Sequence, residues 1–182
     1  MKRLLVVVVT FSLAAPLAAQ TKNEVFAFFD DPSASSTETQ GTKFTTGYGL
    51  ALRHFSSPRV STELSIARHY QYGVYFASIA PGSSEPTLGQ FRARVVPVDL
   101  ISSYHFAPDS FVQPYLGGGV HHVFTFDGPG LGTQTRFELA GGVAFRVTDH
   151  FFIRADGKRL LGGSALTYDP STRGGLGFSW RF

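Results

Sequence analysis

Cysteine is absent from the 182 residues, so no disulfide holds the fold together. Long apolar runs are also missing: the stretch at residues 4–13 is too short to cross a bilayer as a helix, and a mean hydropathy of +0.03 excludes a bundle of membrane helices. The chain also lacks a large excess of positive or negative charge. Without Lys2 and Arg3 the 16 basic residues become 14 against 13 acidic ones, and the net charge falls from +3 to +1. A nucleic-acid partner is therefore not expected.

The first 19 residues have the pattern of a secretory signal peptide. Lys2 and Arg3 form its charged start, residues 4–13 form its apolar stretch, and small residues precede a cleavage site expected between Ala19 and Gln20. This pattern predicts a signal peptide at residues 1–19 and a single domain at residues 20–182. A retained amphipathic anchor is the alternative.

Phenylalanine (18) and glycine (20) are abundant, and their order at the C-terminus is informative. In residues 173–182, Leu176, Phe178, Trp180 and Phe182 alternate with small or cationic residues. Alternate side chains of a strand point to opposite faces, so this strand has one aromatic face. A soluble sheet seldom leaves such a face at a free end, because exposed apolar patches drive association. We therefore predict the closing strand of a transmembrane β-barrel.

Similar alternation recurs along the chain and predicts eight strands, at residues 23–30, 43–53, 60–72, 91–106, 111–126, 136–147, 151–161 and 173–182. Long connections at 31–41, 73–90, 127–135 and 162–171 alternate with short turns, which is typical of an outer-membrane barrel with both termini in the periplasm. The predicted fold is all-β: an eight-stranded antiparallel transmembrane barrel, built as an up-and-down meander. Its predicted location is the bacterial outer membrane, reached by export through the periplasm.

Three strands need comment. The faces of residues 23–30 stay unassigned because phenylalanine occurs on both. Phe44 is expected to face lipid together with Tyr48 and Leu50. Pro97 lacks a ladder donor, so a bulge or bend is expected there. A soluble lipocalin-like barrel is the alternative fold, but its interior would be apolar, whereas the charges here share a face with glycine and alanine.

Four motifs lie in the C-terminal half of the chain. They are residues 96–100 (VPVDL) followed by 104–106 (YHF), residues 113–120 (QPYLGGGV), residues 149–153 (DHFFI), and Asp169-Pro170 before the last strand. In these motifs the chain resembles the OmpW family of outer-membrane proteins. The resemblance implies an eight-stranded barrel with a narrow lumen that passes or binds a small hydrophobic ligand. It also implies that the last strand carries the signal read by the barrel-assembly machinery during insertion, with Leu176, Phe178, Trp180 and Phe182 as its residues.

Charged side chains on the predicted inner face form the candidate lumen lining: Arg53, Glu63, Asp99, Arg136, Glu138, Arg146, Arg154, Asp156, Lys158 and Arg173, with Arg181 on the same face. Charges inside a barrel persist only if they are paired or hydrated. Because eight strands enclose just enough room for side chains, these residues could form a salt-bridged plug. A narrow polar or gated conduit is the second interpretation.

Outward-facing cations are rarer. By strand parity Arg68, Arg92, Arg94 and Arg159 point outward near the extracellular ends of their strands. Arginine binds phosphate with two parallel hydrogen bonds, and lipopolysaccharide carries phosphates at that depth. Contact with lipopolysaccharide is one interpretation of these residues, and ordinary solvation at the interface is the other. Outer-membrane lipid is an expected partner in either case.

The sequence offers no sign of catalysis. A serine needs a base to be activated, and the seventh strand, where a lipid A deacylase of similar size carries His-x-Ser, has no histidine. His121 and His122 face opposite sides of a strand and cannot chelate one metal together. No cofactor is expected, and the chain is predicted not to be an enzyme. A structural barrel with a plugged lumen, acting as a surface adhesin or receptor, is the alternative function.

Overall fold

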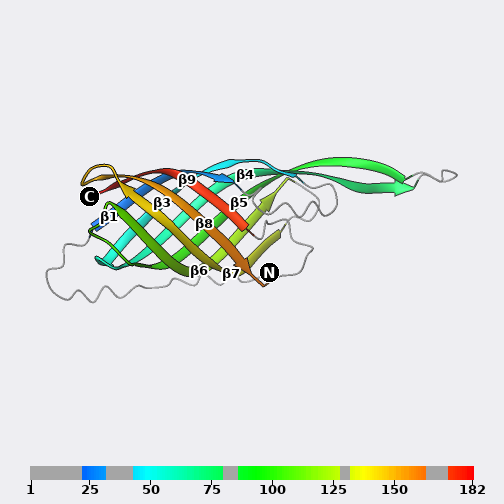
Figure 1. Cartoon of the computed structure of the whole chain (residues 1–182). Coiled ribbons are helices and arrows are strands. Elements are labelled where there is room, and N and C mark those ends of the chain that lie inside the picture. Colours follow the sequence, from blue (N-terminus) through cyan, green and yellow to red (C-terminus); the bar gives the residue numbers. More distant parts are fainter. Residues whose placement is uncertain (1–21, 32–42, 80–85, 128–131, 163–171) are drawn as a thin grey trace.

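The computed structural model describes residues 22–31, 43–79, 86–127, 132–162 and 172–182, which form one antiparallel sheet (Figure 1). Its strands are β1 (Lys22–Asp31), β2 (Lys43–Phe44), β3 (Gly47–Ser57), β4 (Val60–Ile79), β5 (Pro86–His105), β6 (Val112–Phe126), β7 (Gly132–Arg146), β8 (Phe151–Leu161) and β9 (Thr172–Arg181). Within these ranges no helix is long and apolar enough to cross a membrane. The expected signal peptide and the motif Asp169-Pro170 lie outside the described residues.

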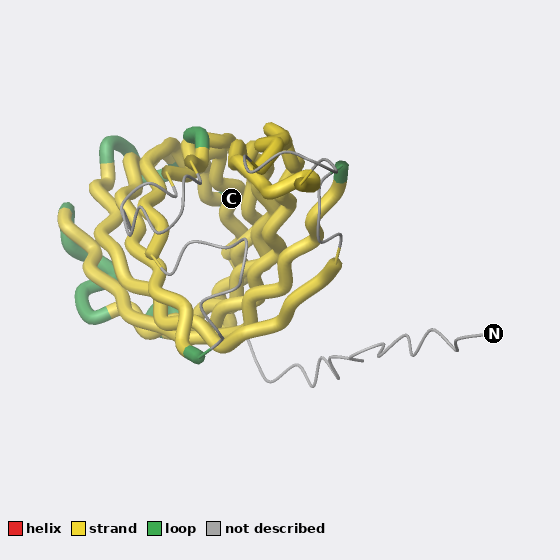
Figure 2. Tube along the Cα trace, turned by 90° about the vertical axis from the view of Figure 1, so that its right-hand side faces the viewer, coloured by secondary structure: helices red, strands yellow, loops and turns green. Residues whose placement is uncertain are grey.

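The sheet closes on itself as an eight-stranded barrel, seen from another side in Figure 2. Apart from the short β2, which pairs with β4, consecutive strands pair with each other, and the ring is completed where β1 pairs with β9. The last residue takes part in this closure, because the backbones of Phe182 and Asn23 exchange two hydrogen bonds of 2.8 Å. The two-residue β2 continues the line of β3 along β4. Together β2 and β3 form one of the eight strands of the barrel. The predicted meander is confirmed.

One extra residue separates β2 from β3 and turns Phe44 to the other face. Tyr48 pairs with Arg68, but Phe44 pairs with Gln71, so the register shifts by one position. Thr45 fills the break: its N–H donates to the carbonyl of Tyr70 at 2.9 Å, and its hydroxyl accepts from the Tyr70 N–H at 3.1 Å. A one-residue shift moves side chains to the opposite face. The prediction that Phe44 faces lipid is therefore wrong; its ring lies edge-on to buried His69, 5.9 Å away.

The β4–β5 hairpin is much longer than predicted. The sequence predicts a loop over residues 73–90, but β4 continues to Ile79 and β5 starts at Pro86, with Gly73 opposite Phe91. Among the described residues this outer part pairs only within the hairpin, and Figure 1 shows it projecting beyond the barrel. In the sequence, glycine, serine and proline between residues 81 and 89 interrupt the β pattern. The bulge expected at Pro97 is not found, because the register on both sides of that residue is the same.

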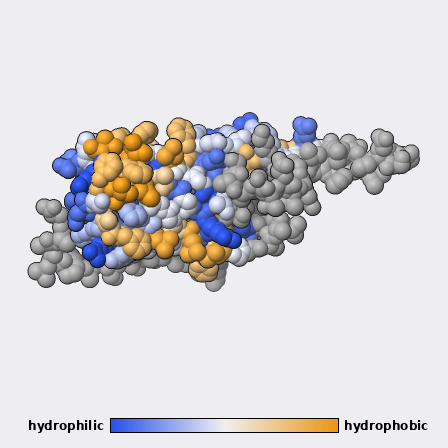
Figure 3. Space-filling model, viewed as in Figure 1, coloured by the Kyte–Doolittle hydropathy of each residue, from blue (hydrophilic) through white to orange (hydrophobic). Residues whose placement is uncertain are grey.

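The barrel is polar inside and apolar outside. Large apolar side chains with about half their surface exposed include Leu50, Leu64, Leu139 and Phe178, and apolar residues gather on the part of the surface away from the hairpin (Figure 3). The inner face holds Phe26 and Phe28, whose stacked rings lie 4.9 Å apart. Phe28 fits because Gly49 lies opposite it on β3; a Cβ there would come within 2.4 Å of the ring. The first strand thus turns Val25, Ala27 and Phe29 outward.

Candidate functional site: the charged interior

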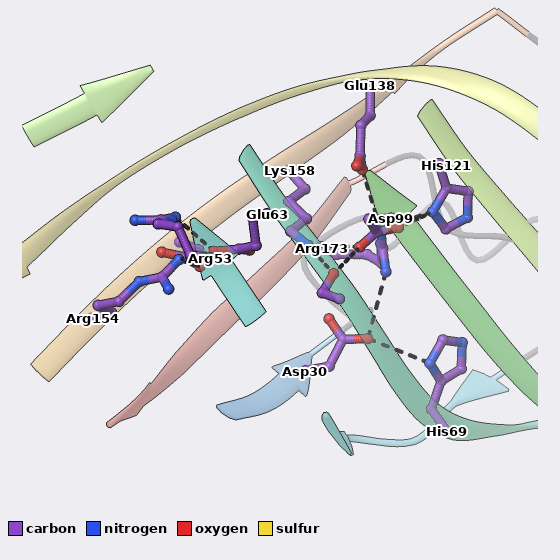
Figure 4. A network of polar contacts seen from close by, with 12 residues as sticks. Asp30, Arg53, Glu63, His69, Asp99, His121, Glu138, Arg154, Lys158 and Arg173 are labelled. Atoms are coloured by element: carbon purple, nitrogen blue, oxygen red, sulfur yellow. Dashed lines mark hydrogen bonds and ion pairs between the residues drawn. The ribbon is translucent and has the colours of Figure 1, made fainter. Parts of the chain in front are cut away.

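Arg154 of β8 is the centre of the first group of interior charges (Figure 4). Its guanidinium lies 3.1 Å from a carboxylate oxygen of Glu24 on β1, 3.0 Å from one of Glu63 on β4, and 2.9 Å from one of Asp156 on β8. It also donates to the hydroxyl of Tyr115 on β6 at 3.1 Å, and that hydroxyl in turn donates to Asp156. One fully buried cation therefore joins side chains of four strands.

Two further arginines complete this group. Arg53 on β3 lies 2.8 Å from Glu63 and 4.0 Å from Glu24, and its guanidinium stacks 4.6 Å from the ring centre of Tyr115. Arg181 on β9 makes two hydrogen bonds, of 3.0 and 2.8 Å, to the second oxygen of Glu24. Charge-assisted contacts of this kind are stronger than neutral ones, and a buried pair is costly to break. The Glu24–Arg181 pair also joins β1 to β9, the two strands at which the ring closes.

Asp99 of β5 is the centre of the second group. Its carboxylate accepts from Lys158 at 2.6 Å, from Arg173 at 3.0 Å, and from Ser65 at 3.1 Å. His121 of β6 lies 2.5 Å from the same carboxylate. Arg173 also lies 3.3 Å from Glu138 of β7 and 3.8 Å from Asp30 of β1. Figure 4 shows the two groups side by side in the interior.

Asp99, His121 and Glu138 could in principle hold a metal ion, because one ligand atom of each lies within 4.8 Å of the others. The cations already present argue against such a site. Arg173 contacts both carboxylates of this trio, and Lys158 contacts Asp99. A divalent ion would have to sit beside these two positive charges in a buried environment, where like charges repel strongly. Arg173 thus occupies the position that a metal would need.

A small cavity lies among these side chains. A cavity of about 10 Å³, lined among others by Arg53, Glu63, Tyr115, Asp156 and Lys158, has room for about one water molecule. It lies between the two groups of charges, because its lining contains members of both. Eight strands leave little more space than inward-facing side chains occupy. The charged residues therefore act as the core of the barrel.

The structure places most of the predicted lumen residues inside the barrel. Arg53, Glu63, Asp99, Glu138, Arg154 and Arg173 are buried, and the side chains of Asp156 and Lys158, members of the same groups, are about nine-tenths buried. Two behave differently. Arg136 is buried but its guanidinium donates to Gln134 on its own strand, at 2.8 Å. Arg146 lies at the turn end of β7 and donates to the carbonyl of Asp109 at 3.0 Å, in an exposed position outside the two groups.

Sequence reasoning missed several members of the interior. Sequence parity alone leaves the faces of β1 unassigned and so misses Glu24 and Asp30, yet both acids fall on one side of that strand, and the acid on the side of Val25 and Phe29 is Asp31 at the strand's end. That asymmetry was a usable signal. No sequence signal marks Tyr115, because its role depends on the position of Arg154 across the barrel. Ser61 and His105 form a buried hydrogen bond of 2.9 Å that no local spacing indicates.

On the outer face, three of the four predicted arginines lie together. Arg68 on β4 and Arg92 and Arg94 on β5 surround Tyr70 and Tyr72. Arg159 lies apart from them, because β8 is paired with β7 and β9 and does not adjoin β4 or β5. All four are outward, but Arg159 does not belong to the cluster of the other three. Parity alone cannot show which strands become neighbours around a ring.

The aromatic face of β9 is also on the outside, with Leu176, Phe178, Trp180 and Phe182 each more than half exposed. An antiparallel barrel with an apolar outer band and a charged, filled interior is the arrangement that a lipid bilayer requires of a β protein. The sequence matches the family of outer membrane protein β-barrel domains over residues 4–182. The chain belongs to this family. It is a protein of the bacterial outer membrane.

Solved structures of outer-membrane barrels resemble the chain in fold. The N-terminal β-barrel domain of Pseudomonas aeruginosa OprF has a TM-score of 0.57 and 19% sequence identity, covering 88% of this chain and 97% of that one. Yersinia pestis Ail in a phospholipid bilayer nanodisc has a TM-score of 0.52 and 15% identity, covering 90% of this chain and 100% of that one. No curated protein matches the sequence. At these identities the likeness concerns the family's barrel fold alone.

Proposed function

We propose that this outer-membrane barrel is closed to solutes and serves as a membrane anchor that presents its long β4–β5 hairpin for surface interactions. The observation that carries the proposal is the position of Arg154, whose guanidinium reaches from β8 to acids on β1 and β4. A solute passing through would have to part these buried ion pairs, and separating one such pair leaves an uncompensated buried charge.

The hairpin supports the second half of the proposal. In outer-membrane barrels the short turns face the periplasm and the long connections face outward. The hairpin lies at the end opposite the chain terminus Phe182 and projects beyond the rest of the barrel (Figure 1). Beyond Gly73 and Phe91 its two strands pair only with each other among the described residues, so their outer edges offer backbone groups to a partner.

The conduit for a small hydrophobic ligand, which the resemblance to the OmpW family implies, stays a prediction. It would require the interior to open, since the cavity there holds about one water. An apolar solute would also replace contacts of buried charges without offering hydrogen bonds in return, which is unfavourable. The geometry therefore supports the plugged barrel over the conduit, and membership of the OmpW branch is a finer question than the family match addresses.

Catalysis receives no support from the Ser61–His105 pair. A nucleophilic serine must reach its substrate, and both side chains are at most 1% exposed inside the barrel. The rings of Phe55 and Tyr115 lie 5.0 and 5.3 Å from that of His105 and fill the space around it. We propose a structural role for the pair, as a polar contact between β4 and β5.

Planar-bilayer recording tests the closed barrel. We expect the refolded wild-type protein to add no steady conductance to a bilayer, whereas Arg154→Ala, which removes the central cation, creates measurable openings. Arg146→Ala is the matched control, because Arg146 is also an arginine of the inner-face pattern but lies outside the two groups. Folding of each variant is checked by heat-modifiable gel mobility.

Steady conductance of the wild-type barrel, or uptake of a small hydrophobic solute by liposomes that contain it, would overturn the proposal in favour of the conduit. Equal conductance of the wild type and Arg154→Ala, with both proteins folded, would show that Arg154 is not what closes the lumen.

A further inference from the structure

Three outward arginines of β4 and β5 form a compact cationic site, which we call the β4–β5 arginine site: Arg68, Arg92 and Arg94, with Tyr70 and Tyr72 between them. The strand register makes the site, because Tyr70 lies opposite Arg94 and Tyr72 lies opposite Arg92. All five residues share the outer face of two neighbouring strands. The side chains therefore meet on the surface of the barrel and not in its interior.

The tyrosines hold the cations close to one another. The guanidinium of Arg92 lies 3.9 Å from the ring centre of Tyr70 and 5.8 Å from that of Tyr72. The guanidinium of Arg68 lies 5.1 Å from the same Tyr70 ring and also donates to its hydroxyl. Two cations thus approach one aromatic ring, which attracts each of them while they repel each other. This arrangement keeps both guanidinium groups positioned for an anion.

The acids around the site do not balance its charge. Arg94 has an ion pair with Asp127 at 3.3 Å, and its guanidinium lies 5.0 Å over the ring of Phe126. Within the described ranges, Arg68 and Arg92 have no carboxylate in ion-pair distance, in contrast to the interior arginines. The site therefore keeps about two positive charges available.

The level of the site on the barrel indicates which anion can reach it. One step toward the turn end of β4, the outward side chains are Ile66 and Leu64, both about half exposed, so the apolar band begins directly beside the arginines. Tyrosines at the edge of such a band mark the depth of the lipid headgroups. An arginine fork recognises phosphate with two parallel hydrogen bonds.

We propose that the β4–β5 arginine site binds the phosphate groups of an outer-leaflet lipid headgroup, that of lipopolysaccharide. A lipid anion fits better than a free one because its acyl chains can lie along Leu64 and Ile66 while its phosphates reach Arg68 and Arg92. Arg159 is the internal contrast. It is an exposed outward arginine on β8, outside the site, and it serves as a matched control.

The test measures lipopolysaccharide retention by native mass spectrometry after identical purification of the wild type, Arg68→Ala/Arg92→Ala and Arg159→Ala. A hydrogen bond to a charged group lost at each arginine corresponds to a loss of roughly tenfold or more in affinity for the double variant, with little change for Arg159→Ala. Heat-modifiable mobility confirms that each variant is folded. Arg68→Lys/Arg92→Lys, which keeps the charge and loses the fork, should fall between the wild type and the alanine variant.

Two competition arms identify the source of the phosphate. Lipopolysaccharide treated with phosphatase should be retained by the wild type no better than by the double alanine variant, and millimolar inorganic phosphate should not displace the intact lipid. Equal retention by the wild type and the double alanine variant would overturn the proposal. Retention of the dephosphorylated lipid at the wild-type level, or full displacement by inorganic phosphate, would overturn it as well.

Discussion

At Arg154 one guanidinium contacts Glu24, Glu63, Asp156 and Tyr115, and its carbon lies 3.8 Å from the ring centre of Phe26. Arg53 and Arg181 would still pair with the two glutamates if Arg154 were removed. Asp156 would keep only the hydroxyl of Tyr115, since no other cation of the described residues lies within ion-pair distance of it. Arg154 therefore matters most to the burial of Asp156.

Replacing Arg154 with Met should accordingly lower the free energy of unfolding by about 3–5 kcal/mol, the usual cost of leaving a buried charge without its partner. Urea unfolding of the protein in lipid vesicles measures the difference. The comparison is Arg94→Ala, which removes the partly exposed pair with Asp127 and should cost about 1 kcal/mol or less. Equal losses for the two variants would contradict a supporting role for the interior charges.

The closing strand β9 has two roles that a pair of variants can separate. Its outward aromatic residues carry the predicted assembly signal, and its backbone completes the ring through the two hydrogen bonds between Phe182 and Asn23. Deletion of Phe182, or Phe182→Ser, should reduce insertion into the outer membrane more than Phe178→Ser, although both rings are more than half exposed. The fraction of heat-modifiable protein in isolated outer membranes measures this. A larger defect for Phe178→Ser would argue against a special role of the terminal residue.

At the scale of strands, the sequence predicts faces well where one face is charged or small. In β7 Glu138 alternates with Phe137 and Leu139, and these residues take the expected sides. Alternation fails in β1, because Phe26 and Phe28 are buried inside the barrel, Phe28 against Gly49, while Phe29 is exposed on the outer face. It also fails at Phe44, where one extra residue reverses the faces. Local pattern cannot show such a shift, since it depends on where Thr45 bonds to the neighbouring strand.

The sequence predicts which charged residues point into the barrel, but not which of them pair with one another. Parity alone turns Arg53, Arg154 and Asp99 inward, because charged side chains avoid lipid. Which acid faces which base depends on distances across the ring, between residues as far apart in sequence as Glu24 and Arg181. The division into a group around Arg154 and a group around Asp99 therefore follows only from the closed barrel.

The whole molecule consists of a closed barrel and a hairpin that extends beyond it. The barrel's ladder is complete without the outer hairpin, because β2 reaches β4 at Tyr72 and β6 reaches β5 at Arg94. The charged residues of the two interior groups do not belong to the outer part of the hairpin. The barrel should therefore fold without the hairpin's outer part, and a surface-interaction role would belong to that part alone.

Removing residues 74–90 and joining Gly73 to Phe91 through an Asn-Gly turn tests this division. These two residues are already opposite each other in the ladder, and Asn-Gly suits a two-residue hairpin turn. We expect an unchanged urea midpoint in lipid vesicles and an unchanged outer-membrane yield, because no ion pair of the interior is removed, whereas adhesion of cells that display the protein should fall to the level of cells without it.

Substitution of residues 80–85 by a glycine-serine tip of equal length is the control, since it keeps both strands and their free edges. If the shortened protein fails to fold while the control folds, the hairpin is part of the barrel's stability. If it folds and adhesion is unchanged, the surface role must lie elsewhere.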